Sequence, residues 1–296
     1  QYDNRTEKGR LISRMIAFKN AGYDFAPVIV RGLTFVEEVN THAQTKSLNS
    51  GNYIFDRESF HKYVWPEVLN CDFDILRTVG EQMPQGMKQI AFSLDGVLEN
   101  TISLVGYERL CMMLYDDRGL VSDIFENVGS RLLEYFKKCL EYDEIGAIIQ
   151  NDDWGFNTQP LLAPGDLREF VFPWHKKMAE AAHAMGKYAI LHSCGNYQTI
   201  IDDVIEYIGV NGRHSYEDNI VPVEKAYIDL KEKIAVLGGI DVDFLARSTP
   251  REIENRCRNM LKISENDGGY ALGSGNSVPD YVPDENYIAM LCSVLN

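Results

Sequence analysis

Two kinds of apolar segment alternate along the chain from residue 88 onward. Short runs of aliphatic and aromatic residues, typical of buried strands, are separated by longer segments whose apolar residues recur at helical spacing. This pattern predicts strands at residues 88–93, 145–150, 187–191, 210–213, 234–238 and 270–272, and helices at residues 107–115, 120–142, 164–185, 197–207, 223–230, 250–263 and from 283 onward. Such alternation is typical of an α/β fold with a parallel sheet and helices outside it, and its length favours a TIM (β/α)8 barrel.

The N-terminal part of the chain is less regular. Residues 7–20 have helical spacing and residues 23–30 form a further predicted strand, which brings the number of predicted strands to seven. Because a closed TIM barrel has eight strands, we expect the first strand to lie upstream of Gln1, unless residues 33–88 supply it. We predict that residues 33–88 are an irregular excursion and that residues 1–296 form a single domain.

The charge of the chain narrows the choice of partners. Its 296 residues carry a formal net charge of −15, which repels phosphate backbones and anionic lipids, so neither nucleic acid nor a membrane is an expected partner. The longest apolar runs are shorter than the roughly 20 residues that a membrane span needs, and no signal peptide opens the chain. The six cysteines include no CxxC pair, so reduced thiols and a cytoplasmic location are expected.

His192 and Cys194 lie two residues apart where the predicted strand 187–191 ends. Residues i and i+2 of an extended segment point to the same side, and imidazole and thiol are both good zinc ligands. The alternative for Cys194 is a small buried hydrophobic residue, which is the usual role of a buried cysteine. The pair by itself therefore predicts half of a metal site.

Polar residues also follow the other predicted strands. The predicted catalytic residues are Asp152, Asp153, His214 and Asp241, and the predicted cofactor-binding residues are Tyr216 and Asn276. In a β/α barrel all of these strand ends face the same mouth, where such enzymes work. Each residue alone could serve as a helix cap or a turn, but their conjunction predicts an active site. Asp152 and Asp153 are adjacent in an extended segment, so only one of them is expected to point into the mouth.

Several of these residues belong to longer motifs. They are Asp-Asp-Trp-Gly at 152–155, His-Ser-Cys-Gly-Asn at 192–196, Gly-Gly-Ile-Asp at 238–241, Thr-Pro-Arg-Glu-Ile-Glu at 249–254 and Gly-Gly-Tyr-Ala-Leu-Gly-Ser-Gly-Asn at 268–276. Together they closely resemble the uroporphyrinogen decarboxylase superfamily, and within it the cobalamin-dependent methyltransferases. That branch includes methylcobalamin:coenzyme M methyltransferases and the methyltransferase components of O-demethylase systems.

The resemblance implies a TIM barrel that uses zinc to move a methyl group between a corrinoid and a small thiol or methoxy compound. A corrinoid such as methylcobalamin is too large for the inside of a filled barrel, so we expect it on a separate carrier protein docked over the mouth. One alternative is a uroporphyrinogen decarboxylase, which needs no metal and would use arginines such as Arg31 and Arg213 to hold its carboxylates. Another is a barrel without catalytic activity that serves as a binding or partner subunit.

The third metal ligand is the open point. The resemblance implies a cysteine after the last Gly-x-Gly, whereas this chain has Asn276, and a neutral amide is a poor zinc ligand. Glu217 is the best remaining candidate, because adjacent strands lie about 5 Å apart and glutamate is long enough to cross that gap. The predicted metal set is thus His192, Cys194 and Glu217, with Asn276 giving at most an amide oxygen or a hydrogen bond to a bound water. His214 could take the place of Glu217, face the barrel interior or bind substrate.

Overall fold

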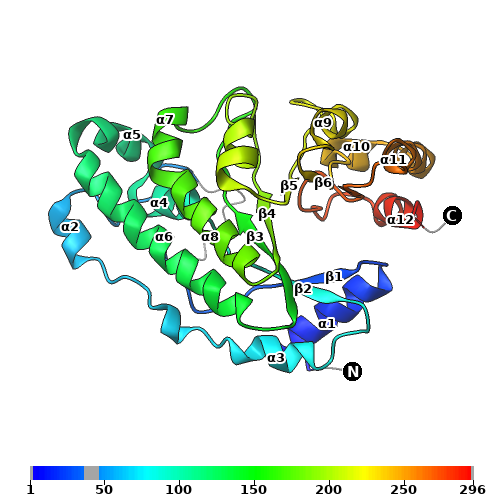
Figure 1. Cartoon of the computed structure of the whole chain (residues 1–296), viewed down its shortest axis with the longest axis horizontal. Coiled ribbons are helices and arrows are strands. Elements are labelled where there is room, and N and C mark those ends of the chain that lie inside the picture. The colour runs from blue at the N-terminus through cyan, green and yellow to red at the C-terminus, as the bar shows by residue number, and fades with distance from the viewer. Residues whose placement is uncertain (1–2, 37–46, 295–296) are drawn as a thin grey trace.

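The computed structural model describes residues 3–36 and 47–294. Its centre is one parallel sheet of seven strands, which follow one another in the same order as in the sequence (Figure 1). The strands are β1 (Phe25–Val28), β2 (Lys88–Phe92), β3 (Ile145–Asn151), β4 (Tyr188–His192), β5 (Gly212–His214), β6 (Ala235–Leu237) and β7 (Tyr270–Ala271). The predicted parallel sheet and the number of its strands are therefore confirmed for the described residues.

The sheet curls as a TIM barrel does, but strand pairing does not close it. Within the described residues, β1 pairs only with β2 and β7 only with β6. The two edges are nevertheless linked, because the hydroxyl of Tyr23, just before β1, lies 2.9 Å from the hydroxyl of Tyr287. The expected eighth strand upstream of Gln1 lies outside the chain and stays a prediction.

Helices cover the outside of the sheet in two groups (Figure 1). The first group is α4 (Val97–Val105), α5 (Tyr107–Asp116), α6 (Arg118–Leu140), α7 (Pro164–Asp166), the π-helix η2 (Leu167–Val171), α8 (Phe172–Ala184) and the π-helix η3 (Asp203–Ile208). The second is α9 (Val223–Leu230), α10 (Val242–Arg247), α11 (Pro250–Ser264) and α12 (Asp284–Cys292). Among the described residues, no helix is long and apolar enough to cross a membrane.

The longest helix, α6, shows how the sequence pattern produces the core. Its residues Ile124, Val128, Leu132, Phe136 and Leu140 recur every four positions and are all buried. Four-residue spacing places side chains on one helix face. That face packs with α8, β2 and β3 in the largest apolar cluster of the molecule.

After the excursion, two helices of the described residues, α4 and α10, were not predicted. In α4 seven of nine residues are buried, so the segment lacks the polar face that gives a helix its recognisable period. The predicted helix 164–185 is continuous through α7, η2 and α8. Of the helix predicted for 197–207, the second half is helical, chiefly as the π-helix η3, and residues 198–200 form a turn. The helix predicted for 7–20 is α1 (Glu7–Asn20), which packs against β1. The excursion between β1 and β2 contains α2 (Arg57–Lys62), the short 3-10 helix η1 (Val68–Asn70) and α3 (Asp74–Gly80), and its residues 37–46 lie outside the described residues.

Candidate functional site

Asp153, His192 and Cys194 come together at the carboxyl ends of β3 and β4. One ligand atom from each side chain lies within 4.8 Å of those of the other two. The strand register pairs Asn151 with His192, so the loops that follow both strands leave the sheet side by side. The Asp153 carboxylate accepts a hydrogen bond of 2.8 Å from the backbone N–H of Cys194. We call these three residues the acid–imidazole–thiol cluster.

A pair of glycines allows the two loops to meet at this cluster. Gly195, directly after Cys194, has a φ of +102°, and a Cβ at this position would lie 2.4 Å from the backbone of Gly155. Only glycine combines this backbone conformation with so close an approach. The Gly at position 195 thereby fixes where Cys194 stands relative to the loop that carries Asp153.

The donor atoms of the cluster fit zinc. Carboxylate oxygen, imidazole nitrogen and thiolate sulfur are its usual protein ligands, and a catalytic zinc ion takes three of them and leaves a fourth position open. Ligand atoms around a tetrahedral zinc ion lie roughly 3–4 Å apart, given zinc–ligand distances of about 2.0–2.3 Å. Small side-chain movements are enough to bring the cluster to that spacing.

His214 sets the protonation of His192. The Nε2–H of His214 donates to the carbonyl of Ser274 at 3.0 Å, and the Nδ1 atoms of the two histidines lie 2.6 Å apart. Burial lowers the pKa of both rings, that of His214 to about 4, so both are neutral near pH 7. Neutral His214 then accepts the Nδ1–H of His192, which leaves the lone pair on Nε2 of His192 available for a metal.

The sulfur of Cys194 receives two polar contacts. The Nδ2 of Asn276 lies 3.2 Å from the sulfur, and the hydroxyl of Ser215 lies 3.6 Å from it. The amide of Asn276 is oriented by its Oδ1, which accepts the backbone N–H of Ser277 at 2.8 Å. Asn276 therefore presents a donor to the sulfur, where the sequence led us to expect an amide oxygen or a contact with water.

The thiol of Cys194 needs a cation in order to ionise. Burial, and then the nearby Asp153 and Glu217 carboxylates, raise its pKa to about 12. A thiol with this pKa is neutral at physiological pH and is a poor nucleophile and a poor ligand. A divalent metal within the cluster would reverse this effect, because a coordinating thiol loses its proton.

Asp152 has a different environment from its neighbour Asp153. Its side chain is fully buried and accepts hydrogen bonds of 2.8–3.0 Å from the backbone N–H groups of Leu98 and Glu99, the indole of Trp154 and the Nε2 of His175. The first two N–H groups belong to the N-terminus of α4, which favours a negative charge. Asp152 was predicted to be catalytic, but it holds α4 and α8 against β3 and does not join the cluster.

Glu217 was predicted to be the third ligand, but the geometry favours Asp153 for that place. Among the acidic residues that the structure describes, Asp153 and not Glu217 completes the cluster with His192 and Cys194. The reason is that the hydrogen bond from the Cys194 backbone draws Asp153 toward the thiol, an approach between loops that the sequence spacing does not reveal. Glu217 lies nearby, and burial raises the pKa of its carboxyl.

Asp241 and Tyr216 also lie outside the cluster. Asp241 caps α10, where it accepts the backbone N–H groups of Asp243 at 2.8 Å and Phe244 at 3.1 Å. This helix cap was the alternative to its predicted catalytic role. Tyr216 is buried, and its ring packs on the guanidinium of Arg213.

Glu99 is a candidate functional residue that the sequence did not single out. Burial and the carboxylates of Asp152, Asp153 and Asp95 raise its pKa to about 9, so it is protonated near pH 7. Perturbed carboxyl groups of this kind are typical of active sites. Nothing in the sequence marks Glu99, because it lies on α4, whose helical pattern is hidden by burial on all sides.

Comparisons with known proteins agree with this fold. The uroporphyrinogen decarboxylase (URO-D) family matches residues 38–295. A uroporphyrinogen decarboxylase from Anaeromyxobacter dehalogenans is 24% identical over 258 residues, covering 77% of this chain and 69% of that protein. A methyltransferase from Methanosarcina mazei has a similar structure with a TM-score of 0.70 and 15% sequence identity, covering 98% of this chain and 85% of that chain.

A Listeria monocytogenes protein assigned as a vitamin-B12-independent methionine synthase is also similar, with a TM-score of 0.57 and 12% identity over 98% of this chain and 85% of that chain. At such identities the two solved structures indicate a shared barrel-like fold. The family match, in contrast, covers most of the sequence. The chain therefore belongs to the uroporphyrinogen decarboxylase (URO-D) family of enzymes.

Proposed function

We propose that this protein is a zinc-dependent methyltransferase that moves a methyl group between a corrinoid on a partner carrier protein and a small thiol or methoxy compound. The observation that carries the proposal is the cluster of Asp153, His192 and Cys194, whose donor atoms suit zinc. Bound there, zinc would lower the pKa of a thiol or polarise an ether oxygen, and either effect favours methyl transfer near neutral pH.

The residues around the cluster have distinct tasks in this proposal. His214 keeps the proton of His192 on Nδ1, so that Nε2 has a free lone pair for a metal. Asn276 and Ser215 donate to the sulfur of Cys194 and stabilise its negative charge. The carboxylate of Glu217, whose pKa burial raises, takes the proton from an incoming thiol.

A second candidate is decarboxylation of a tetrapyrrole, which the relative from Anaeromyxobacter dehalogenans favours. A substrate with several carboxylates requires several cationic side chains. The cluster consists of an acid, an imidazole and a thiol and supplies none. Methyl transfer therefore ranks first.

Zinc content and methyl transfer test the proposal together. We expect near-stoichiometric zinc in the purified protein, and loss of zinc in Cys194→Ala but not in Cys292→Ala, a cysteine of α12 outside the cluster. When methylcobalamin is mixed with a panel of thiols, the wild type should remove its methyl group, which changes the absorption spectrum of the corrinoid. Cys194→Ala should not. A zinc-free protein that decarboxylates uroporphyrinogen would establish the second candidate instead.

A further inference from the structure

Arg213 is a buried cation without an acidic partner. It is 5% exposed, and no described carboxylate lies within ion-pair distance of it, although its charge acts on the carboxyl of Glu217. One terminal nitrogen donates to the carbonyl of Ser193 at 3.4 Å, and Nε has no hydrogen-bond partner. A buried charge is normally paired, because its removal from water is costly. The guanidinium therefore has N–H donors that are free to bind an anion.

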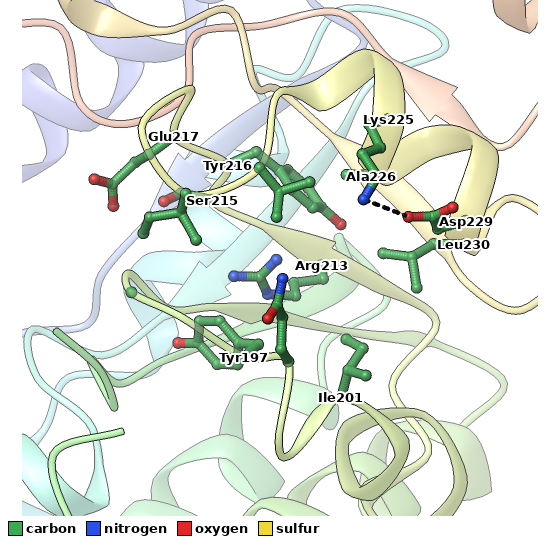
Figure 2. Close-up of a pocket in the computed structure, with 14 residues that line it drawn as sticks. Tyr197, Ile201, Arg213, Ser215, Tyr216, Glu217, Lys225, Ala226, Asp229 and Leu230 are labelled. Atoms are coloured by element: carbon green, nitrogen blue, oxygen red, sulfur yellow. Dashed lines mark ion pairs between the residues drawn. The ribbon is translucent and has the colours of Figure 1, made fainter. Parts of the chain in front are cut away.

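Two tyrosine rings enclose this guanidinium. Its central carbon lies 3.9 Å from the ring centre of Tyr197 and 4.7 Å from that of Tyr216, and Figure 2 shows Arg213 between the two rings. The N–H groups of a guanidinium lie in its plane, so they point out between the rings. The hydroxyl of Tyr216 is also buried and lacks a hydrogen-bond partner among the described residues. Two unused polar groups thus lie close together.

A recess opens over these groups. Its volume is about 150 Å³, many times the roughly 10–15 Å³ that one water molecule needs. Apolar side chains form much of its wall, among them Ile201, before η3, and Leu230 of α9 (Figure 2). Lys225 lies at the same recess and is paired with Asp229 at 3.9 Å.

The side chain of Arg213 points away from the acid–imidazole–thiol cluster. Successive residues of a strand point to opposite faces of the sheet, so Arg213 lies on the other face of β5 from His214, which contacts His192. The recess lies between the segment before η3 and α9, and one end of it adjoins the cluster at Gly195, Ser215 and Glu217. An inference about the recess therefore does not depend on methyl transfer.

We propose that this recess binds a small organic monocarboxylate with an apolar body. Its carboxylate accepts hydrogen bonds from the guanidinium of Arg213 and the hydroxyl of Tyr216, and its body packs against Ile201 and Leu230. A carboxylate fits a planar guanidinium with parallel hydrogen bonds. The apolar wall favours an organic acid over inorganic phosphate or sulfate.

Benzoate is a suitable probe, and calorimetric titration of the metal-stripped full chain tests the proposal. We expect saturable binding of one benzoate per chain, at least roughly tenfold weaker in Arg213→Met and weaker in Tyr216→Phe. Neutral benzamide should bind at least roughly tenfold more weakly than benzoate to the wild type. Arg247→Met removes an exposed arginine of α10 and should leave benzoate binding unchanged.

Both variants should fold. Arg213→Met removes an unpaired buried charge, and Tyr216→Phe keeps the aromatic ring. Thermal unfolding of each variant checks this. Absence of saturable benzoate binding to the wild type at millimolar concentration would overturn the proposal. So would equal affinity in wild type, Arg213→Met and Tyr216→Phe. Benzoate binding that appears only in Glu217→Gln would also overturn the proposal. It would mean that the Glu217 carboxylate already forms an ion pair with Arg213 in the wild type.

Discussion

Asp152 and Asp153 are chemically identical neighbours with different surroundings. The carboxylate of Asp152 is surrounded by N–H donors of the protein, whereas that of Asp153 contacts the backbone of Cys194 and belongs to the cluster. An asparagine at position 152 cannot accept all of those hydrogen bonds, because one of its two terminal atoms is itself a donor. The same replacement at position 153 removes a candidate metal ligand from a partly buried position.

We therefore expect Asp152→Asn to lower the free energy of unfolding by about 2–4 kcal/mol, since it leaves buried donors without acceptors. Asp153→Asn should leave that free energy nearly unchanged and lower the zinc content. Denaturant unfolding and elemental analysis of both proteins measure the two effects. Equal loss of stability, or unchanged zinc in Asp153→Asn, would contradict the assignment.

Asn276 offers a second test at the level of one residue. Its amide lies 3.2 Å from the Cys194 sulfur, so a cysteine in its place would stand close enough to join the metal site. We expect Asn276→Cys to bind zinc at least about tenfold more tightly in a competition with a chelator, because a thiolate is added to three existing ligands. Zinc that appears only in this variant would instead show that the natural chain does not hold the metal.

Glu99 should make stability depend on pH. Its pKa is raised from 4.5 in the unfolded chain to about 9 in the fold, so the folded state keeps a proton that the unfolded state releases. The contribution of Glu99 to the stability of the folded state is therefore complete below about pH 4.5 and is lost as the pH rises to about 9.

Between about pH 4.5 and pH 9, the free energy of unfolding of the metal-stripped wild type should therefore fall. Its fall should exceed that of Glu99→Gln by at least about 1.4 kcal/mol. The glutamine mimics the protonated acid and can still accept the N–H of Gly96. Glu108→Gln, an exposed position on α5, is the control and should follow the wild type. Parallel curves for wild type and Glu99→Gln would refute the raised pKa.

At the level of elements, the loops after β3 and β4 determine the site. The sequence pattern predicted both strands and the His192 and Cys194 half of the cluster, because strand alternation is a local property. It identified Asp153 as one of two candidate carboxylates, but it assigned the third ligand to Glu217. The choice depends on how closely two loops approach at Gly155 and Gly195, a contact between segments about 40 residues apart that hydrophobic spacing does not encode.

The approach of these loops can be tested at Gly195. Its φ of +102° and the 2.4 Å contact of a Cβ with Gly155 mean that Gly195→Ala must displace the loop. We expect a loss of at least about 2 kcal/mol in the free energy of unfolding together with lower zinc content.

Gly186→Ala is the matched control for this variant. Gly186 also has a positive φ, +66°, but a Cβ there would meet nothing within 4 Å. Gly186→Ala should lower the free energy of unfolding by about 1 kcal/mol through its backbone conformation alone and leave zinc binding intact. Equal zinc loss in both variants would mean that general destabilisation, and not the position of the loop, controls the site.

For the whole molecule, the two ends of the sheet are linked by a contact other than strand pairing. The described residues of β1 and β7 do not pair with each other, yet Tyr23 beside β1 contacts Tyr287 of α12 through their hydroxyl groups at 2.9 Å. This hydrogen bond joins residues 264 positions apart in the sequence. It therefore links the first strand of the sheet to the last helix.

A double-mutant cycle measures what this link contributes. Tyr23→Phe keeps the ring contacts with Phe18 and Phe25, so the change isolates the hydroxyl. We expect Tyr23→Phe and Tyr287→Phe each to lower the free energy of unfolding by about 1 kcal/mol, and the double variant to lose little more than either single one. Fully additive losses would mean that the hydroxyls act independently, so that the two edges are held together by apolar packing alone.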